Sequence, residues 1–141
     1  MIVLIDTNVM LDILLQREPY SIDAARLSVL SEKGCIHSYL SASAVTDIFY
    51  IARKELKDKE VAHELIQKIV KTVHIAAVTE NSIVEALELK WNDFEDAVQY
   101  SVGKSISANY IITRNPDDYA NSEISIVSPR MLLDQIESAE Q

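Results

Sequence analysis

The sequence contains few residues of the kinds that interrupt helices or cross-link chains. Its 141 residues include 2 glycines, 3 prolines and 1 cysteine. Because glycine and proline disfavour helix interiors, their scarcity predicts a helix-rich protein. The single cysteine, Cys35, excludes an internal disulfide, which fits a reducing cytoplasm. Cys35 lies in a stretch that leans apolar, where a free thiol is more often buried filler than a reactive group.

Long apolar runs and an excess of basic residues are also missing. The first apolar run ends at Asp6, too early for a signal peptide or a membrane span, so we expect a cytoplasmic protein with no membrane partner. The chain has 13 Lys and Arg against 22 Asp and Glu, a net charge of −9. Because phosphate contacts need Lys and Arg, this balance argues against a protein that binds nucleic acid with its whole surface. It suits an acidic cleft that collects metal cations, or a basic partner.

What is present is the composition of a globular protein. Hydrophobic residues make up 48% and charged residues 25% of the chain. This balance excludes an intrinsically disordered protein, and the length is that of one ordinary domain with a real core. We therefore expect a single domain over residues 1–141.

Short apolar segments alternate with helical patterns along the chain. Strands are expected at 3–5, 35–40, 73–78, 110–113 and 124–127. Helical segments separate the first four, and a polar loop over residues 114–121 separates the fourth from the fifth. Alternation of this kind predicts an α/β protein with a parallel sheet covered on both faces. In such sheets ligands bind beyond the carboxyl ends of the strands, so the residues that follow each strand are the first candidates for chemistry.

Carboxylates follow the first two expected strands. Asp6 comes directly after the first, and its oxygens are donors that Mg²⁺ or Mn²⁺ prefers; the alternative is a cap for the next helix. Asp47 lies near the start of the helix after the second strand, between apolar Val45 and Ile48. It is either a carboxylate buried beside a partner or ion, or a residue that faces solvent.

Three acids open the helix expected from residue 93. Asp93 is the expected helix cap, Asp96 lies in the first turn and can point into the cleft, and Glu95 is expected to be a solvated surface charge. After the fourth strand, Asn115 and Asp118 are the polar groups best placed to complete a metal shell. The alternative there is an Asx-rich turn around a proline.

Acids therefore follow three of the four strand exits that lead to one crevice. Crowded carboxylates repel one another, and divalent cations relieve that repulsion. Such cations can also activate water and stabilise the charge that builds on a scissile phosphate, which is the chemistry of a phosphodiesterase. We expect Arg114, beside the proposed site, to contact a substrate phosphate.

Several segments, taken in order, resemble the PIN-domain family, in particular its prokaryotic branch with the VapC-like and PilT N-terminus-like ribonucleases. The segments that carry the resemblance are Asp-Thr-Asn at 6–8, Arg-Glu-Pro at 17–19, Thr-Asp-Ile-Phe-Tyr-Ile-Ala-Arg-Lys at 46–54, Asp-Phe-Glu-Asp-Ala at 93–97 and Thr-Arg-Asn-Pro-Asp-Asp-Tyr at 113–119. Together they span nearly the whole chain.

The resemblance implies a three-layer α/β/α fold with a central parallel sheet of four to five strands. It implies a Mg²⁺- or Mn²⁺-dependent endoribonuclease that cleaves single-stranded RNA, forms a homodimer and acts as the toxin of a toxin–antitoxin pair with a cognate antitoxin. By position it assigns catalytic and metal-binding roles to Asp6, Asp47, Asp96 and Asp118. The residues it assigns to supporting roles are Thr7, Asn8, Asp93, Thr113 and Asn115.

Two positions depart from the family pattern. Asp47 stands where most members have glutamate, and Asn115 stands where many have aspartate. A shorter or uncharged side chain weakens a cation site, so the alternative is a PIN module that binds RNA or a partner protein without cutting it. A metal-dependent phosphatase or DNA nuclease is a third possibility. It is disfavoured because no segment of the sequence resembles a phosphoryl-accepting motif such as Asp-x-Asp.

Overall fold

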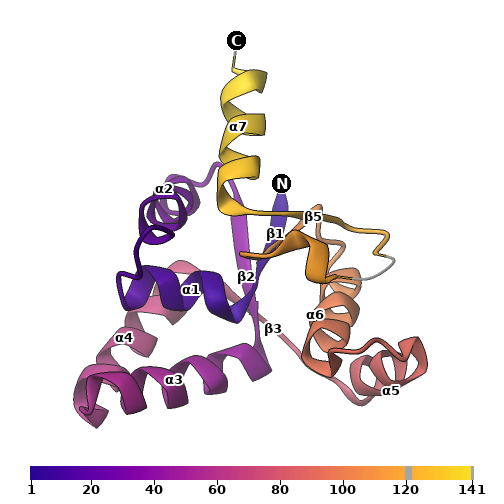
Figure 1. The fold of residues 1–141 in the computed structure, drawn as a ribbon, viewed down its shortest axis with the longest axis horizontal. Coiled ribbons are helices and arrows are strands. Elements are labelled where there is room, and N and C mark those ends of the chain that lie inside the picture. The colour runs from indigo at the N-terminus through magenta and orange to yellow at the C-terminus, as the bar shows by residue number, and fades with distance from the viewer. Residues whose placement is uncertain (120–121, 141) are drawn as a thin grey trace.

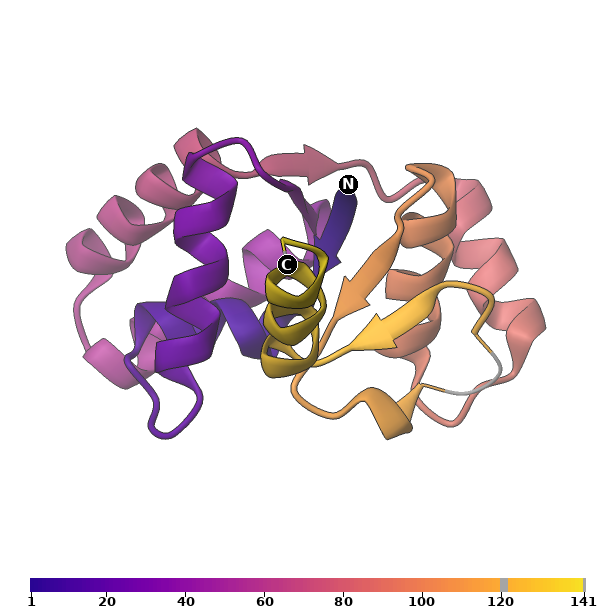
Figure 2. The ribbon, with the colours of Figure 1, turned by 90° about the horizontal axis from the view of Figure 1, so that it is seen from above.

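A single parallel sheet organises the protein (Figures 1 and 2). The structure is a computed structural model that describes residues 1–119 and 122–140, apart from the side chain of Asp118. The sheet has five strands in the order β3-β2-β1-β4-β5, and every neighbouring pair is parallel. The strands are β1 (Ile2–Ile5), β2 (His37–Ser41), β3 (His74–Ala76), β4 (Tyr110–Ile112) and β5 (Ser125–Val127).

Helices cover both faces of this sheet, as Figure 2 shows from above. The α-helices are α1 (Thr7–Leu14), α2 (Ser21–Glu32), α3 (Ala42–Leu56), α4 (Lys59–Thr72), α5 (Glu80–Leu89), α6 (Phe94–Ser105) and α7 (Pro129–Ala139). One hydrophobic cluster packs α1–α4 and α7 on one face, and a second packs α5 and α6 on the other. The expected three-layer α/β/α arrangement around a parallel sheet is therefore confirmed, with five strands.

The central strand β1 supplies both clusters. Its side chains alternate between the two faces because the strand repeat is two residues, so Val3 and Ile5 enter one cluster and Leu4 enters the other. Val3 and Leu4 have no exposed surface. A strand buried on both faces must be apolar throughout, which explains the unbroken run that ends at Asp6.

Most of the α-helices begin directly after a polar residue whose side chain caps the first turn. The side chains of Ser41, Thr79 and Asp93 accept hydrogen bonds from backbone N–H groups in the first turns of α3, α5 and α6. Cys35 is exposed, so the prediction of a buried thiol was wrong. The reason is that β2 begins only at His37, and Ile36 fills the core at this point.

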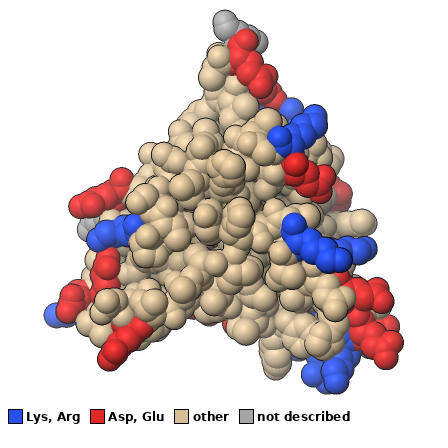
Figure 3. All heavy atoms as spheres, turned by 180° about the vertical axis from the view of Figure 1, so that it is seen from behind, with Lys and Arg blue, Asp and Glu red and all other residues tan. Residues whose placement is uncertain are grey.

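Charged side chains lie mainly toward the margins of the face seen in Figure 3. The middle of that face is uncharged. The Lys and Arg side chains at its margins are separated by uncharged surface and by acids. For the part of the chain that the structure describes, this face therefore offers no continuous basic track for a phosphate backbone. None of the described helices is both long and apolar enough to cross a membrane.

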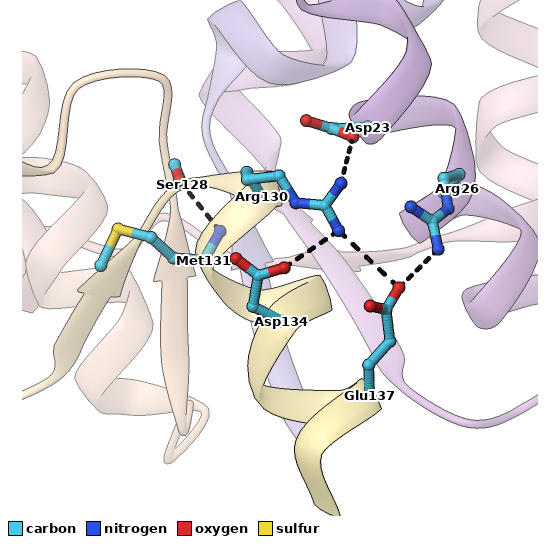
Figure 4. A network of polar contacts seen from close by, with 7 residues as sticks. All are labelled: Asp23, Arg26, Ser128, Arg130, Met131, Asp134 and Glu137. Carbon is cyan, nitrogen blue, oxygen red and sulfur yellow. Dashed lines mark hydrogen bonds and ion pairs between the residues drawn. The ribbon is translucent and has the colours of Figure 1, made fainter. Parts of the chain in front are cut away.

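Helix α7 is joined to α2 by a network of exposed ion pairs (Figure 4). The Arg130 guanidinium lies 3.3 Å from Asp23, 3.1 Å from Asp134 and 3.7 Å from Glu137, and Arg26 lies 2.6 Å from Glu137. The Arg130 side chain is 44% exposed. Because water screens exposed ion pairs, each is worth at most about 1 kcal/mol.

Burial of apolar side chains should hold α7 more strongly than this network does. Leu132 is fully buried, so Leu132→Ala is expected to lower the free energy of unfolding by about 2–5 kcal/mol. Arg130→Ala should lower it by about 1 kcal/mol or less. Urea unfolding followed by circular dichroism measures both values. An Arg130→Ala effect as large as that of Leu132→Ala would show that the ion pairs dominate.

Candidate active site

The candidate site lies at the carboxyl edge of the sheet, where the strand order reverses. From β1 the chain continues to β2 on one side, and β4 returns to the other side of β1. Crevices form at such reversal points in open parallel sheets. Asp6 follows β1 and Thr113 follows β4, and the Asp6 N–H donates to the Ile112 carbonyl at 2.9 Å.

The Asp6 carboxylate is fixed by hydrogen bonds from three segments. One oxygen accepts from the Thr7 N–H at 2.7 Å, which makes Asp6 the N-cap of α1. The other accepts from the Thr113 hydroxyl at 2.9 Å, and the Gln99 side chain on α6 also hydrogen-bonds this carboxylate. The two interpretations of Asp6 are therefore compatible, because one oxygen caps the helix while the other faces the strand exit.

Burial raises the pKa of Asp6 above the ordinary value for aspartate. The hydrogen bonds from Thr113, Thr7 and Gln99 lower this pKa, but desolvation is the larger effect, and the nearby charge of Asp93 adds to the rise. The structure thus holds a desolvated carboxylate beside a second acid.

Asp47 and Glu95 join Asp6 around one pocket of about 190 Å³. Burial raises the pKa of Glu95, and the charges of Asp47, Asp93 and Asp6 raise it further. Glu95 is exposed, as predicted for a surface charge, and it also lines the pocket with Asp6 and Asp47. Its place in the first turn of a helix that starts at the sheet edge is the sequence signal that could have found it.

Asp47 itself is exposed, so of its two interpretations the solvent-facing one is correct. Its neighbours Ala44 and Ile48 carry the buried face of α3, and Asp47 lies off that face. It still lines the pocket with Asp6. Apolar neighbours in sequence therefore did not mean burial, because successive residues of a helix point in different directions.

Asp93 and Asp96 lie at the start of α6. The Asp93 side chain accepts from the Asp96 N–H at 3.1 Å, which confirms Asp93 as the cap. The buried phenol of Tyr119 has its pKa raised by burial and then by the charges of Asp6, Asp96 and Asp93. Tyr119 is therefore close enough to all three acids to feel their charges, and a shared contact of Asp6 and Asp96 with one ion stays a prediction.

Arg114 has a partner inside the protein. Its guanidinium makes a bidentate ion pair with Asp12, a residue of α1 that is 1% exposed, and it lies 4.1 Å from the ring centroid of Tyr20. A contact between Arg114 and a substrate phosphate therefore stays a prediction. The role of Asp12 was missed, although a lone acid within the apolar run of α1 was a usable signal.

Asn8, Asn115 and Asp118 are the other residues that the sequence assigned to the site. The Asn8 side-chain oxygen is buried and has no hydrogen-bond partner. Asn115 is exposed and precedes the 3-10 helix Pro116–Asp118 without capping it through its side chain. The Asp118 side chain lies outside the described part of the structure, so its predicted metal contact is untested.

The donor set fits a hard divalent cation. All the acids supply oxygen, and none of the ion pairs among the described residues involves Asp6, Asp47, Asp93 or Glu95. The Gln99 amide oxygen beside Asp6 is buried without a partner. In the described residues, no group of three or more His, Cys, Asp or Glu is arranged to hold an ion, so a cation would require side-chain movement. Oxygen donors of this kind suit Mg²⁺ or Mn²⁺.

The fold and the site define a doubly wound parallel α/β protein with an acidic pocket at its topological switch point. A family model described as PIN domain matches residues 2–117. The chain belongs to the PIN domain family. No match was found among curated proteins.

Solved structures of toxin–antitoxin proteins share this fold. VapBC-1 from nontypeable Haemophilus influenzae is 16% identical, with a TM-score of 0.71 and coverage of 92% of this chain and 99% of that one. VapBC2 from Rickettsia felis, bound to a DNA fragment from its promoter, is also 16% identical, with a TM-score of 0.68 and coverage of 91% and 98%. VapC20 from Mycobacterium tuberculosis, a toxin that cleaves the sarcin-ricin loop, is 13% identical, with a TM-score of 0.68 and coverage of 82% and 92%. At these identities the likeness establishes the fold alone.

Asp6→Asn is expected to stabilise the metal-free protein at neutral pH. Because burial raises the pKa of Asp6, the folded protein binds the Asp6 proton more tightly than the unfolded chain does. Ionisation of Asp6 therefore opposes folding above the folded-state pKa, and the penalty vanishes below the unfolded-state pKa of about 3.9. Urea unfolding at several pH values should show a higher stability of Asp6→Asn at neutral pH and a difference that shrinks in acid. A less stable variant at neutral pH would contradict this assignment.

Proposed function

We propose that this chain is an endoribonuclease that cleaves single-stranded RNA with the help of Mg²⁺ or Mn²⁺. The observation that carries the proposal is the pocket that Asp6, Asp47 and Glu95 line at the switch point of a PIN fold. Ionisation of a desolvated carboxylate surrounded by further acids is unfavourable unless a cation binds.

Asp6, Asp96, Asp47 and Asp118 are the proposed cation ligands, and Glu95 borders the same pocket. When bound, the cation supplies a Lewis acid that favours the attack of water and stabilises charge on the phosphate. Thr7 and Thr113 fix the orientation of Asp6 before substrate arrives. In the proposed hydrolysis the water oxygen bonds to phosphorus and a carboxylate of the cluster accepts a proton of the water. The bond from phosphorus to the leaving ribose oxygen breaks, and that oxygen takes up a proton from solvent to leave as a hydroxyl.

The acidity of the protein is consistent with this function. With a net charge of −9, the free protein repels phosphates at long range. A cation held by the acidic cluster reverses the charge locally, so RNA would bind at the site rather than along a basic surface. Affinity for RNA should therefore depend on the cation, and Arg114 would contribute only if it exchanged Asp12 for a phosphate.

We further propose that the protein is a cytoplasmic, single-domain homodimer and the toxin of a toxin–antitoxin pair with a cognate antitoxin. The similarity to VapBC structures supports this part, since those structures contain toxins of the same fold. The alternative is a PIN module that binds RNA or protein without cleavage. It is favoured by the exposed, short Asp47 and by the lack of a preformed group of three ligands among the described residues.

Removal of a proposed cation ligand should abolish cleavage. Asp96→Asn is expected to lower the rate of single-stranded RNA cleavage on the order of a hundredfold or more, because it removes charge that holds the ion. The matched control Asp134→Asn changes an exposed acid of α7 that does not line the pocket, and it should retain activity. A labelled RNA oligonucleotide in Mg²⁺ or Mn²⁺ reports the rates, with single-stranded DNA and a phosphomonoester as comparison substrates. Unchanged cleavage in excess EDTA, or by Asp96→Asn, would refute the proposal.

Direct cation binding separates the nuclease from the inactive module. Calorimetric titration of the protein with Mn²⁺ should show binding that is strongly weakened in Asp6→Asn and preserved in Asp134→Asn. The physical reason is that hard cations bind through ionised carboxylates, and Asn supplies only a neutral oxygen. No detectable heat at millimolar Mn²⁺ would favour the module that does not cut.

A further inference from the structure

The acidic pocket also has an apolar lining. Beside Asp6, Asp47 and Glu95, the hydrophobic residues that line it are Ala44, Val78, Ile83, Phe94 and Val98. The volume of about 190 Å³ suits one heterocyclic ring system and is too small for a helix or strand of a partner. The pocket thus combines hydrogen-bond acceptors with an apolar wall.

Phe94 is the most unusual part of this wall. It directly precedes Glu95 in the first turn of α6, yet the residue is 45% exposed. The neighbouring Ile83 on α5 is 36% exposed. An aromatic ring that keeps this much contact with water, beside carboxylates, gains from a ligand that covers it.

We propose that this pocket receives the base of the nucleotide next to the cleaved phosphodiester, with Phe94 as its stacking surface. The inference rests on the proposed function, since the acids of the same pocket would place the scissile phosphate. The sugar–phosphate chain cannot enter the acidic pocket without a cation, but an uncharged base can. A base also has both features that the pocket requires: a flat face for Phe94 and N–H groups that donate to Glu95, which is not among the proposed cation ligands.

Another ligand with a flat face and N–H donors is an arginine side chain of a partner protein. The guanidinium is smaller than a base and would cover little of the wall that Val78, Ile83 and Val98 extend beyond Phe94. The extent of the apolar wall therefore favours a base, and the experiment includes an arginine derivative to test this choice.

Binding can be observed without catalysis because the chain has 2 phenylalanines. Phe49 packs against the His63 ring with centroids 4.8 Å apart and does not line the pocket, so it is an internal control. In protein labelled at the phenylalanine rings, titration with the uncharged nucleoside adenosine should shift the Phe94 ring signals and leave those of Phe49 in place. N-acetylargininamide should shift Phe94 less at equal concentration. No Phe94 shift at saturating adenosine, or a stronger response to the arginine derivative, would overturn the proposal.

Cleavage gives a second, independent test. Phe94→Ala should lower kcat/KM for RNA roughly 5- to 150-fold, the range expected when one base loses its aromatic partner. Phe94→Trp should restore activity, and Leu87→Ala, which removes a 60% exposed side chain of α5 outside the pocket, should stay within about twofold of the parent. An abasic nucleotide next to the mapped cut site should reduce cleavage by the parent protein and cause no further loss in Phe94→Ala.

The two proposals fail in different ways. If the parent protein cleaves RNA and Phe94→Ala cleaves equally well, the base pocket is wrong and the nuclease stands. If the parent neither cleaves RNA nor binds Mn²⁺, the nuclease is wrong, and the adenosine titration still decides whether the pocket accepts a base.

Discussion

The structure depends on the placement of one carboxylate at the end of a buried strand. The residues of β1 before Asp6 form the centre of two hydrophobic clusters, so the position of Asp6 is fixed by the core itself. Burial makes its negative charge unfavourable, and hydrogen bonds from Thr7, Thr113 and Gln99 offset this only in part. The acids that gather around it increase the repulsion. A protein selected for stability alone would place an uncharged residue here, so the charge indicates function.

Polar atoms without partners gather in the same region. The Gln99 amide oxygen and the Tyr119 hydroxyl are buried and unpaired, although both residues interact with Asp6, through a hydrogen bond or through its charge. Buried polar groups are usually paired, and exceptions often mark sites that bind an ion or water. Together with the raised pKa values of Asp6 and Glu95, these unpaired atoms indicate a site whose hydrogen bonds and charges are satisfied only when an ion or water is bound.

Much of the fold could be predicted from sequence because its signals are local. Short apolar segments between helical patterns specified the strands, and Asp93 marked the start of its helix correctly. The place of Asp6 at the carboxyl edge of the sheet followed from the topology of parallel sheets. The directions of side chains on helices did not follow, since they depend on how each helix is rotated against the sheet. For this reason the burial of Asp47 was left open, the place of Glu95 in the pocket was not foreseen, and the ion pair between Asp12 and Arg114 was missed.

That ion pair has a consequence for how the site meets a cation. Asp6 and Asp12 lie six residues apart on one segment, and Thr113 and Arg114 are adjacent on another, so the two segments are joined at two points. Two attachments resist sliding of one segment along the other, whereas a single attachment would allow rotation about it. The first carboxylate is therefore held rigidly, whereas Asp47 and Glu95 project from exposed turns of α3 and α6. An arriving ion would therefore meet one carboxylate that is held in place, Asp6, and others, Asp47 and Glu95, whose side chains can adjust their positions.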